Sequence, residues 1–74
     1  MKITIESTTR TVDVNGVPAR VWEGQTESGI PVAVMVTRIA VPPGHDVAQF
    51  ERELIECAPP TALGTGPWPT RMVL

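Results

Sequence analysis

Apolar and polar residues alternate along the first forty positions with a period of two, which predicts β-strands. Ile3 and Ile5 occupy odd positions, whereas Val12 and Val14 occupy even positions. A continuous strand cannot move its apolar side chains from one face of a sheet to the other without an irregularity. We therefore predict a β-bulge or a break within Ser7-Thr8-Thr9.

Two turn signals divide residues 1–41 into the strands of a β-meander. Asn15-Gly16 is typical of a type I′ hairpin turn, because both central residues of that turn need a positive φ. The segment Thr26-Glu27-Ser28-Gly29 predicts a longer hairpin loop that closes with Gly29 in the left-handed conformation. The two turns predict the cross-strand pairs Val14–Val17, Val12–Ala19, Thr11–Arg20, Trp22–Val34, Val21–Met35 and Arg20–Val36.

This register separates two faces of the sheet, because successive side chains of a strand point to opposite sides. The first face carries Val12, Val14, Val17, Ala19, Val21, Ala33, Met35, Ile39 and Val41. The second face carries Thr11, Asp13, Arg20, Trp22, Val32, Val34, Val36 and Arg38. The run from Ile30 to Val41 is apolar on both faces for most of its length, which is typical of a central strand that is covered twice.

One helix is predicted over residues 46–58, after the strand stops at Pro42-Pro43-Gly44. Asp46 is a suitable N-cap, and Gln49 can complete a capping box. Pro59-Pro60 ends the helix. An apolar stripe at helical spacing consists of Val47, Phe50, Leu54, Cys57 and Ala58.

The chain as a whole (1–74) predicts a single α+β domain: a small antiparallel β-meander of three to five strands with one α-helix packed on one face. Residues 59–70 hold Gly and Pro without a period and predict an irregular loop, and residues 71–74 are apolar enough for a short terminal strand. One helix covers only one face of the sheet. The other face would leave an apolar patch in water, formed by Trp22, Val32, Val34 and Val36.

An exposed apolar patch of this kind usually marks an interface, so we expect a homo-oligomer. The alternative is that the tail from Pro59 to Leu74 covers the patch within one chain, with Trp68 folded back onto it.

Composition excludes several classes of function. The 74 residues carry six basic and eight acidic side chains, and the basic ones are scattered, so we expect no binding to duplex nucleic acid. One cysteine and one histidine cannot form a disulfide or a four-ligand zinc site, and we expect no metal and no cofactor. No apolar run has the length of a membrane span, and the start lacks a signal-peptide core. We expect a cytoplasmic protein without membrane contact.

No set of residues predicts catalysis, and we expect that the protein is not an enzyme. His45 and Cys57 flank the predicted helix twelve residues apart, so the helix rise separates them by roughly 16–18 Å. A nucleophile and its base must come within hydrogen-bond reach. The carboxylates of the helix lie on its solvated side, without a second cluster facing them. The alternative is an enzyme whose catalytic site is composed of residues from two subunits.

Arg20, Trp22 and Arg38 share the second face and form a candidate ligand-binding set. Guanidinium groups bind phosphate or carboxylate in a two-pronged manner, and an indole offers a surface on which a base can stack. The alternative is that Trp22 anchors an interface while both arginines pair with acids such as Asp13 or Glu23. Tryptophan and arginine also dominate protein interfaces.

Six segments carry a resemblance to known sequences: residues 2–8, 15–24, 27–30, 37–41, 49–54 and 71–74. With these segments the chain resembles short uncharacterised proteins encoded in bacterial phages and prophages. The resemblance implies an accessory protein that inhibits host defences by binding, and it assigns no functional residue.

We therefore expect a non-catalytic binding protein, located in the bacterial host, that masks a host protein or sequesters a small phosphorylated ligand such as a signalling nucleotide. The alternative is a structural or assembly component that adds a strand to a partner's sheet.

Overall fold

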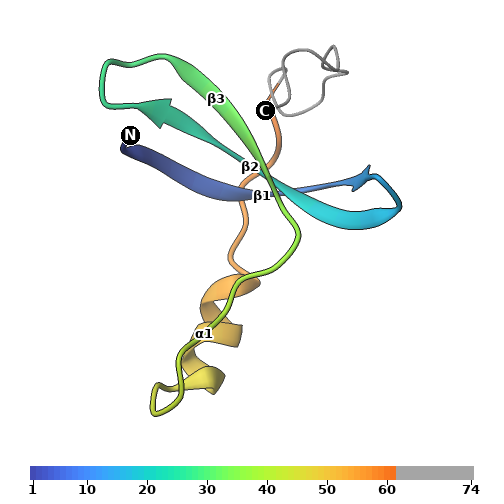
Figure 1. Cartoon of the computed structure of the whole chain (residues 1–74), viewed down its shortest axis with the longest axis vertical. Coiled ribbons are helices and arrows are strands. Elements are labelled where there is room, and N and C mark those ends of the chain that lie inside the picture. The colour runs from blue at the N-terminus through green and yellow to red at the C-terminus, as the bar shows by residue number, and fades with distance from the viewer. Residues whose placement is uncertain (62–74) are drawn as a thin grey trace.

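The computed structural model describes residues 1–61 and shows an antiparallel sheet with one short helix (Figure 1). Its elements in chain order are β1 (Ile3–Val14), β2 (Val17–Thr26), β3 (Pro31–Val36) and α1 (Val47–Leu54). The three strands lie in the order β1-β2-β3, which is the low end of the predicted number of strands. Most of the predicted loop 59–70, Trp68 and the predicted terminal strand 71–74 lie outside the described residues.

Both predicted hairpin registers are confirmed. Asn15 and Gly16 have φ values of 51° and 84°, as a type I′ turn requires, and the Asp13 carboxylate accepts a hydrogen bond of 2.6 Å from the Gly16 N–H. Gly29 closes the second hairpin with a φ of 88°. The observed pairs include Val14–Val17, Val12–Ala19, Thr11–Arg20, Trp22–Val34, Val21–Met35 and Arg20–Val36.

The predicted irregularity in the first strand is also confirmed. Ser7 pairs with Trp22 and Thr11 pairs with Arg20, so three residues of β1 face the single residue Val21 of β2. The bulge removes a normal ladder partner from the Val21 carbonyl. The Thr8 hydroxyl replaces that partner and donates a hydrogen bond of 2.6 Å to the Val21 oxygen.

β3 spans only Pro31–Val36 and is an edge strand in the described part of the sheet, so residues 1–61 do not show the predicted central strand over residues 30–41. Two short hairpins in succession place the strands side by side in chain order, which puts β2 in the centre. The strand ends at Val36, and the chain then leaves the sheet toward the helix (Figure 1). No residue of β3 is buried. Its apolar composition therefore does not reflect coverage of both faces.

The core of the described residues is small and lies at the middle of β2. Val21 is fully buried and Ala19 is 3% exposed, and they are the only buried apolar residues in this part of the chain. Ser7 and Thr8, next to them on β1, are the buried polar residues. So small a core contributes little apolar burial, which leaves stability dependent on backbone pairing.

The helix is shorter than predicted, spanning Val47–Leu54 instead of residues 46–58. Asp46 is the N-cap, as predicted, and accepts a hydrogen bond of 3.0 Å from the Gln49 N–H. The Gln49 side chain accepts a hydrogen bond from Arg52 instead of completing a capping box. The helix stops four residues early because the residues after Leu54 leave it to pair with β1, where the Ala58 N–H donates to the Ser7 oxygen.

The residues that follow the helix pair with β1 at the bulge. Ala58 forms an isolated parallel bridge with Thr8. Its N–H donates to the Ser7 oxygen at 3.0 Å, and its oxygen accepts from the Thr9 N–H at 3.1 Å. The segment after α1 is thereby held along the free edge of β1.

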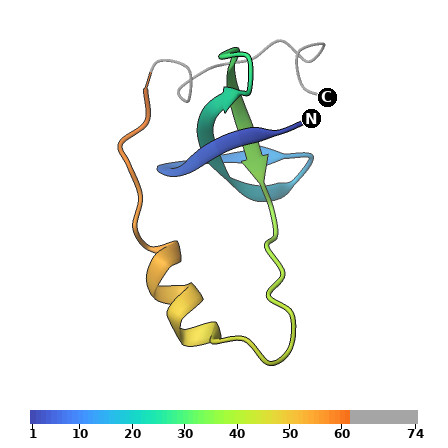
Figure 2. The same cartoon turned by 90° about the vertical axis from the view of Figure 1, so that its left-hand side faces the viewer.

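The expected packing of the helix across one sheet face is not observed. Figures 1 and 2 show α1 below the sheet, past the C-terminal end of β3, connected to it by the segments before and after the helix. None of the helix residues is buried. Contact with the sheet occurs at the C-terminal turn, where the Arg20 guanidinium of β2 donates to the Leu54 oxygen at 2.8 Å.

Candidate ligand-binding pocket

A pocket of about 290 Å³ lies where the second face of the sheet meets the C-terminal turn of α1. The strand-to-helix segment 37–39 forms a further wall. The lining residues are Thr11, Pro18, Ala19, Arg20, Trp22, Val36, Thr37, Arg38, Ile39, Phe50 and Leu54. The structure thus brings the three predicted ligand-binding residues Arg20, Trp22 and Arg38 together in one lining.

The strand register explains why these side chains converge. Arg20 and Trp22 are two residues apart on β2, so they point to the same face. Val36 pairs with Arg20 across β2 and β3 and lies on that face too. Of the predicted interface residues, Trp22 and Val36 line the pocket, whereas Val32 and Val34 lie farther along β3 and do not.

Arg20 is held in place by the end of the helix. Its Nη1 donates to the Leu54 oxygen at 2.8 Å and to the Cys57 Sγ at 3.4 Å. The last carbonyls of a helix lack partners within the helix and carry partial negative charge, so a guanidinium there is favourable. Arg20 is therefore an ordered cation in the pocket wall, and its other N–H groups make no hydrogen bond within residues 1–61.

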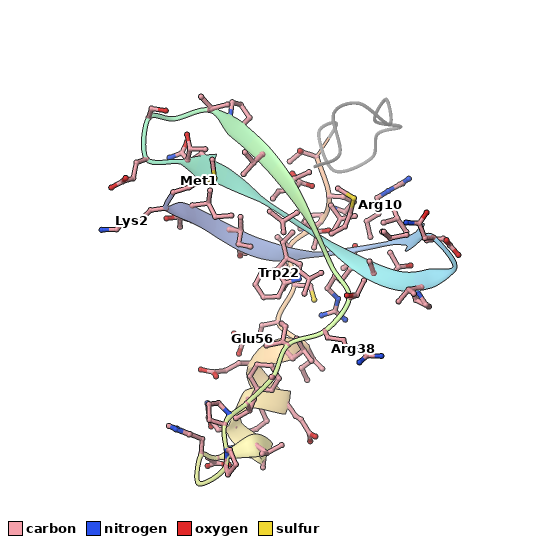
Figure 3. The ribbon with its side chains drawn as sticks, in the orientation of Figure 1. Met1, Lys2, Arg10, Trp22, Arg38 and Glu56 are labelled. Carbon is pink, nitrogen blue, oxygen red and sulfur yellow. The ribbon has the colours of Figure 1, made fainter. Side chains whose placement is uncertain are left out.

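Arg38 differs from Arg20 in being exposed and unpaired. Its side chain has no hydrogen bond or ion pair with any of the described residues, and Figure 3 shows it extending outward from the molecule. Trp22, in contrast, is half-buried and lies between the sheet and the helix in the same view. The pocket therefore combines an indole in its wall with a guanidinium at its margin.

The acids that were considered as alternative partners of the arginines are engaged elsewhere. Asp13 accepts the hydrogen bond from Gly16 in the first turn. Glu23 accepts hydrogen bonds from the Thr61 N–H at 3.0 Å and from the Thr61 hydroxyl. Within residues 1–61, neither acid forms an ion pair with Arg20 or Arg38.

Part of the lining was missed by sequence reasoning. Phe50 and Leu54 were assigned to the apolar stripe of the helix, and Thr37 and Ile39 to the continuation of a strand. The apolar stripe of the helix could have indicated these lining residues, because Phe50 and Leu54 belong to it and both line the pocket. The missing information was the early end of β3, which turns residues 37–39 into a pocket wall.

His45 and Cys57 lie at opposite ends of the helix, as the sequence predicts. His45 is exposed before the first turn, and the Cys57 Sγ accepts from Arg20 and lies 3.8 Å from the Ser7 hydroxyl that donates to it. Residues 1–61 contain no group of three or more side chains suited to hold a metal ion. In the same part of the chain, no helix has the length and apolar character that crossing a bilayer demands.

Comparisons of the chain with protein-family models, curated proteins and solved structures find no match in any of the three.

Proposed function

We propose that this chain is a non-catalytic binding protein that holds a small phosphorylated ligand with an aromatic base, of the nucleotide class, in the pocket between β2 and α1. The observation that carries the proposal is the convergence of Arg20, Trp22 and Arg38 in one lining. The lining contains two cations, threonines and apolar side chains, which suits an anion attached to a flat apolar group.

Each part of the pocket has a separate task in this proposal. Arg38 is not held by another described residue, so its planar guanidinium can turn to bind a phosphate through two parallel hydrogen bonds. Trp22 offers its ring to the base, an interaction of about 1–3 kcal/mol per base. Arg20 adds a positive charge. Because hydrogen bonds already hold its side chain, little conformational entropy is lost there when a ligand binds.

The volume limits the size of the ligand. Pockets for small molecules range over about 300–1,000 Å³, and this one, with about 290 Å³, is just below that range. A single nucleotide unit fits such a volume, whereas a larger ligand would extend past the margin at Arg38. The proposed ligand is therefore one nucleotide or one unit of a larger signalling nucleotide.

The biological setting is proposed from the resemblance to phage and prophage proteins. In that setting the protein acts in the bacterial cytoplasm and inhibits a host defence system by stoichiometric binding. The pocket supports sequestration of a signalling nucleotide, and masking of a host protein is the alternative form of inhibition.

Calorimetric titration of the full chain with a panel of linear and cyclic nucleotides tests this function. At least one nucleotide is expected to bind, and Arg38→Ala should weaken that binding by about 10- to 150-fold, the equivalent of a lost hydrogen bond to a charged group. Arg52→Ala is the matched control, because Arg52 lies on the exposed side of α1 and contacts Gln49. No heat from any nucleotide, or equal affinity in Arg38→Ala and parent, would contradict the proposal.

A homo-oligomer is also proposed, supported by the incomplete burial of the apolar patch. Trp22, Val32, Val34 and Val36 are each only half-buried in the single chain. Together with a core of two buried apolar residues, this leaves a small domain that gains much from a partner copy.

Strand addition to a different protein is the second candidate function, and the free edge of β3 favours it. An extended segment of a partner would pair with this edge through its backbone. Absence of nucleotide binding, together with a purified partner that protects the β3 amides from hydrogen exchange, would favour assembly over sequestration.

A further inference from the structure

The outer edge of β3 exposes an ordered set of backbone hydrogen-bonding groups. The Thr26 N–H donates to the Ile30 oxygen at 3.0 Å, which fixes where the hydrogen-bonded pairs of the β2–β3 ladder begin. Because these pairs alternate along an antiparallel ladder, the N–H and C=O groups of the even residues of β3 point toward β2. The groups of Ala33 and Met35 then point away from β2. Neither residue has another backbone partner among residues 1–61.

This edge lacks the features that usually prevent pairing between chains. Edge strands are commonly protected by charged side chains, bulges or prolines within the strand. No charged residue occurs between Gly29 and Thr37, β3 has no bulge, and Pro31 is only its first residue. An edge of this kind is open to another strand.

We propose that a second copy of this chain pairs with it through β3, antiparallel and about a two-fold axis at Val34. In this register Ala33 lies opposite Met35 of the partner subunit, and each exchanges its outward N–H and C=O groups with the other. The symmetry repeats the same exchange at Met35 and Ala33 of the partner subunit. Between these two hydrogen-bonded pairs, Val34 lies opposite Val34 of the partner subunit. This pair exchanges no backbone hydrogen bonds and has the shorter Cα separation.

The chemistry of the edge selects a second copy as its occupant. The only unsuitable group is Pro31, which has no N–H, and this register places it at the margin opposite Thr37 of the partner subunit, where its carbonyl accepts. On the second face, Val32 and Val36 meet Val36 and Val32 of the partner subunit. A neutral strand thus meets a neutral strand, and the two sheets join into one of six strands.

The dimer also changes the pocket. Val36 lines the pocket, and Val32 of the partner subunit lies beside it in the proposed register. Ile30 of the partner subunit, 60% exposed in the single chain, follows toward the margin at Arg38. The second copy therefore extends the apolar wall of the pocket. This contribution to the site rests on the proposed function, whereas the pairing of the strands does not.

Sedimentation equilibrium of the full chain tests the pairing. The parent is expected at twice its 8.0 kDa mass at micromolar concentration. Ala33→Pro removes one outward N–H per subunit and leaves the bonds to β2 in place, so it should raise the dimer dissociation constant at least about tenfold. Ala33→Ser is the matched control, because it keeps the N–H and should remain dimeric. A monomeric parent, as would result if the tail of the chain occupies this edge, overturns the proposal, and so does a fully dimeric Ala33→Pro.

Cysteine cross-linking tests the register without depending on altered stability. In a Cys57→Ser background, Val34→Cys places two thiols in the close pair at the two-fold axis, within the Cα separation that a disulfide allows. Oxidised glutathione, the oxidant of the experiment, should convert this variant to a covalent dimer. Val32→Cys is the control, because four residues along the strand separate its two copies by about 13 Å. Equal cross-linking of both variants, or none at position 34, overturns the register.

The two proposals fail in different ways. A cross-linked dimer that binds no nucleotide retains the strand pairing and removes the ligand site. A monomer that binds a nucleotide through Arg38 retains the ligand site and removes the pairing.

Discussion

At the residue scale, Gly24 is the position where the sheet tolerates no side chain. It pairs with Ile5, and a Cβ atom built on Gly24 would overlap the Thr4 carbonyl and lie 2.8 Å from the Ile5 Cα. These are backbone atoms of β1, so no side-chain rotation relieves the overlap. A glycine within a strand often marks such a close approach of two backbones.

Gly24→Ala should therefore destabilise the fold by forcing β1 away from β2. We expect a loss of about 3 kcal/mol in the free energy of unfolding, the upper end of the range for overpacking. Chemical denaturation followed by circular dichroism measures it. Gln25→Ala, at the exposed neighbouring position, is the control and should change stability little. Equal stability of the two variants would show that β1 moves aside without cost.

At the scale of elements, the bulge in β1 organises the sheet edge. It adds two residues to β1, so odd positions stay on one face and the isoleucines and valines lie on opposite faces. It also offers the Ser7 and Thr9 backbone to the segment that follows α1. Ser7 adds a hydrogen bond of 3.1 Å to the Glu56 oxygen. The bulge therefore connects the end of the helix to the sheet, and with it one wall of the pocket.

The Thr8 hydroxyl should be the group that stabilises this bulge. Thr8→Val keeps the shape of the side chain but leaves the Val21 oxygen without its donor, and Thr8 is only 2% exposed. A buried acceptor without a partner costs about 1–3 kcal/mol, which urea denaturation would measure. Thr9→Val makes the same exchange at an exposed site in the bulge and should cost much less. A Thr8→Val protein as stable as Thr9→Val would contradict this role.

At the scale of the whole molecule, the described chain holds much exposed apolar surface around a small core. Ile30, Ile39 and Val47 are 60%, 44% and 51% exposed, while only two apolar residues are buried. The backbone hydrogen bonds of Ala58 with β1 and the hydrogen bond from Arg20 to the Leu54 oxygen connect the sheet to the helix. Such a domain is expected to gain a substantial part of its stability from association.

The thermal midpoint should therefore depend on protein concentration. If folding is coupled to pairing through β3, a higher concentration favours the paired native state by mass action and raises Tm. Calorimetric scans over a hundredfold range of concentration test this, with Ala33→Pro as the variant in which the dependence should vanish. A Tm that is constant over that range in the parent would indicate that the single chain is stable alone.

The local features of this protein are predictable from its amino-acid sequence. Turn chemistry at Asn15-Gly16 and Gly29 indicates the registers of both hairpins, and Asp46 is recognisable as the N-cap. The change from odd to even apolar positions coincides with the bulge, although the two residues that the bulge adds leave the faces unchanged. Placing Arg20 and Trp22 on one face followed from the same registers. These features depend on residues close together in the chain, and backbone sterics and period-two alternation are sufficient to predict them.

How these parts contact one another depends on non-local packing. Contacts between distant segments ended the helix at Leu54, joined Arg20 to its last carbonyl and brought Ala58 to the bulge. They also placed β3 at an edge, although its composition is that of a buried strand. Apolar composition indicates that burying a segment lowers the free energy of the chain. Which surface covers the segment depends on non-local packing. The pocket exists for the same reason: its walls come from segments more than thirty residues apart that no local pattern connects.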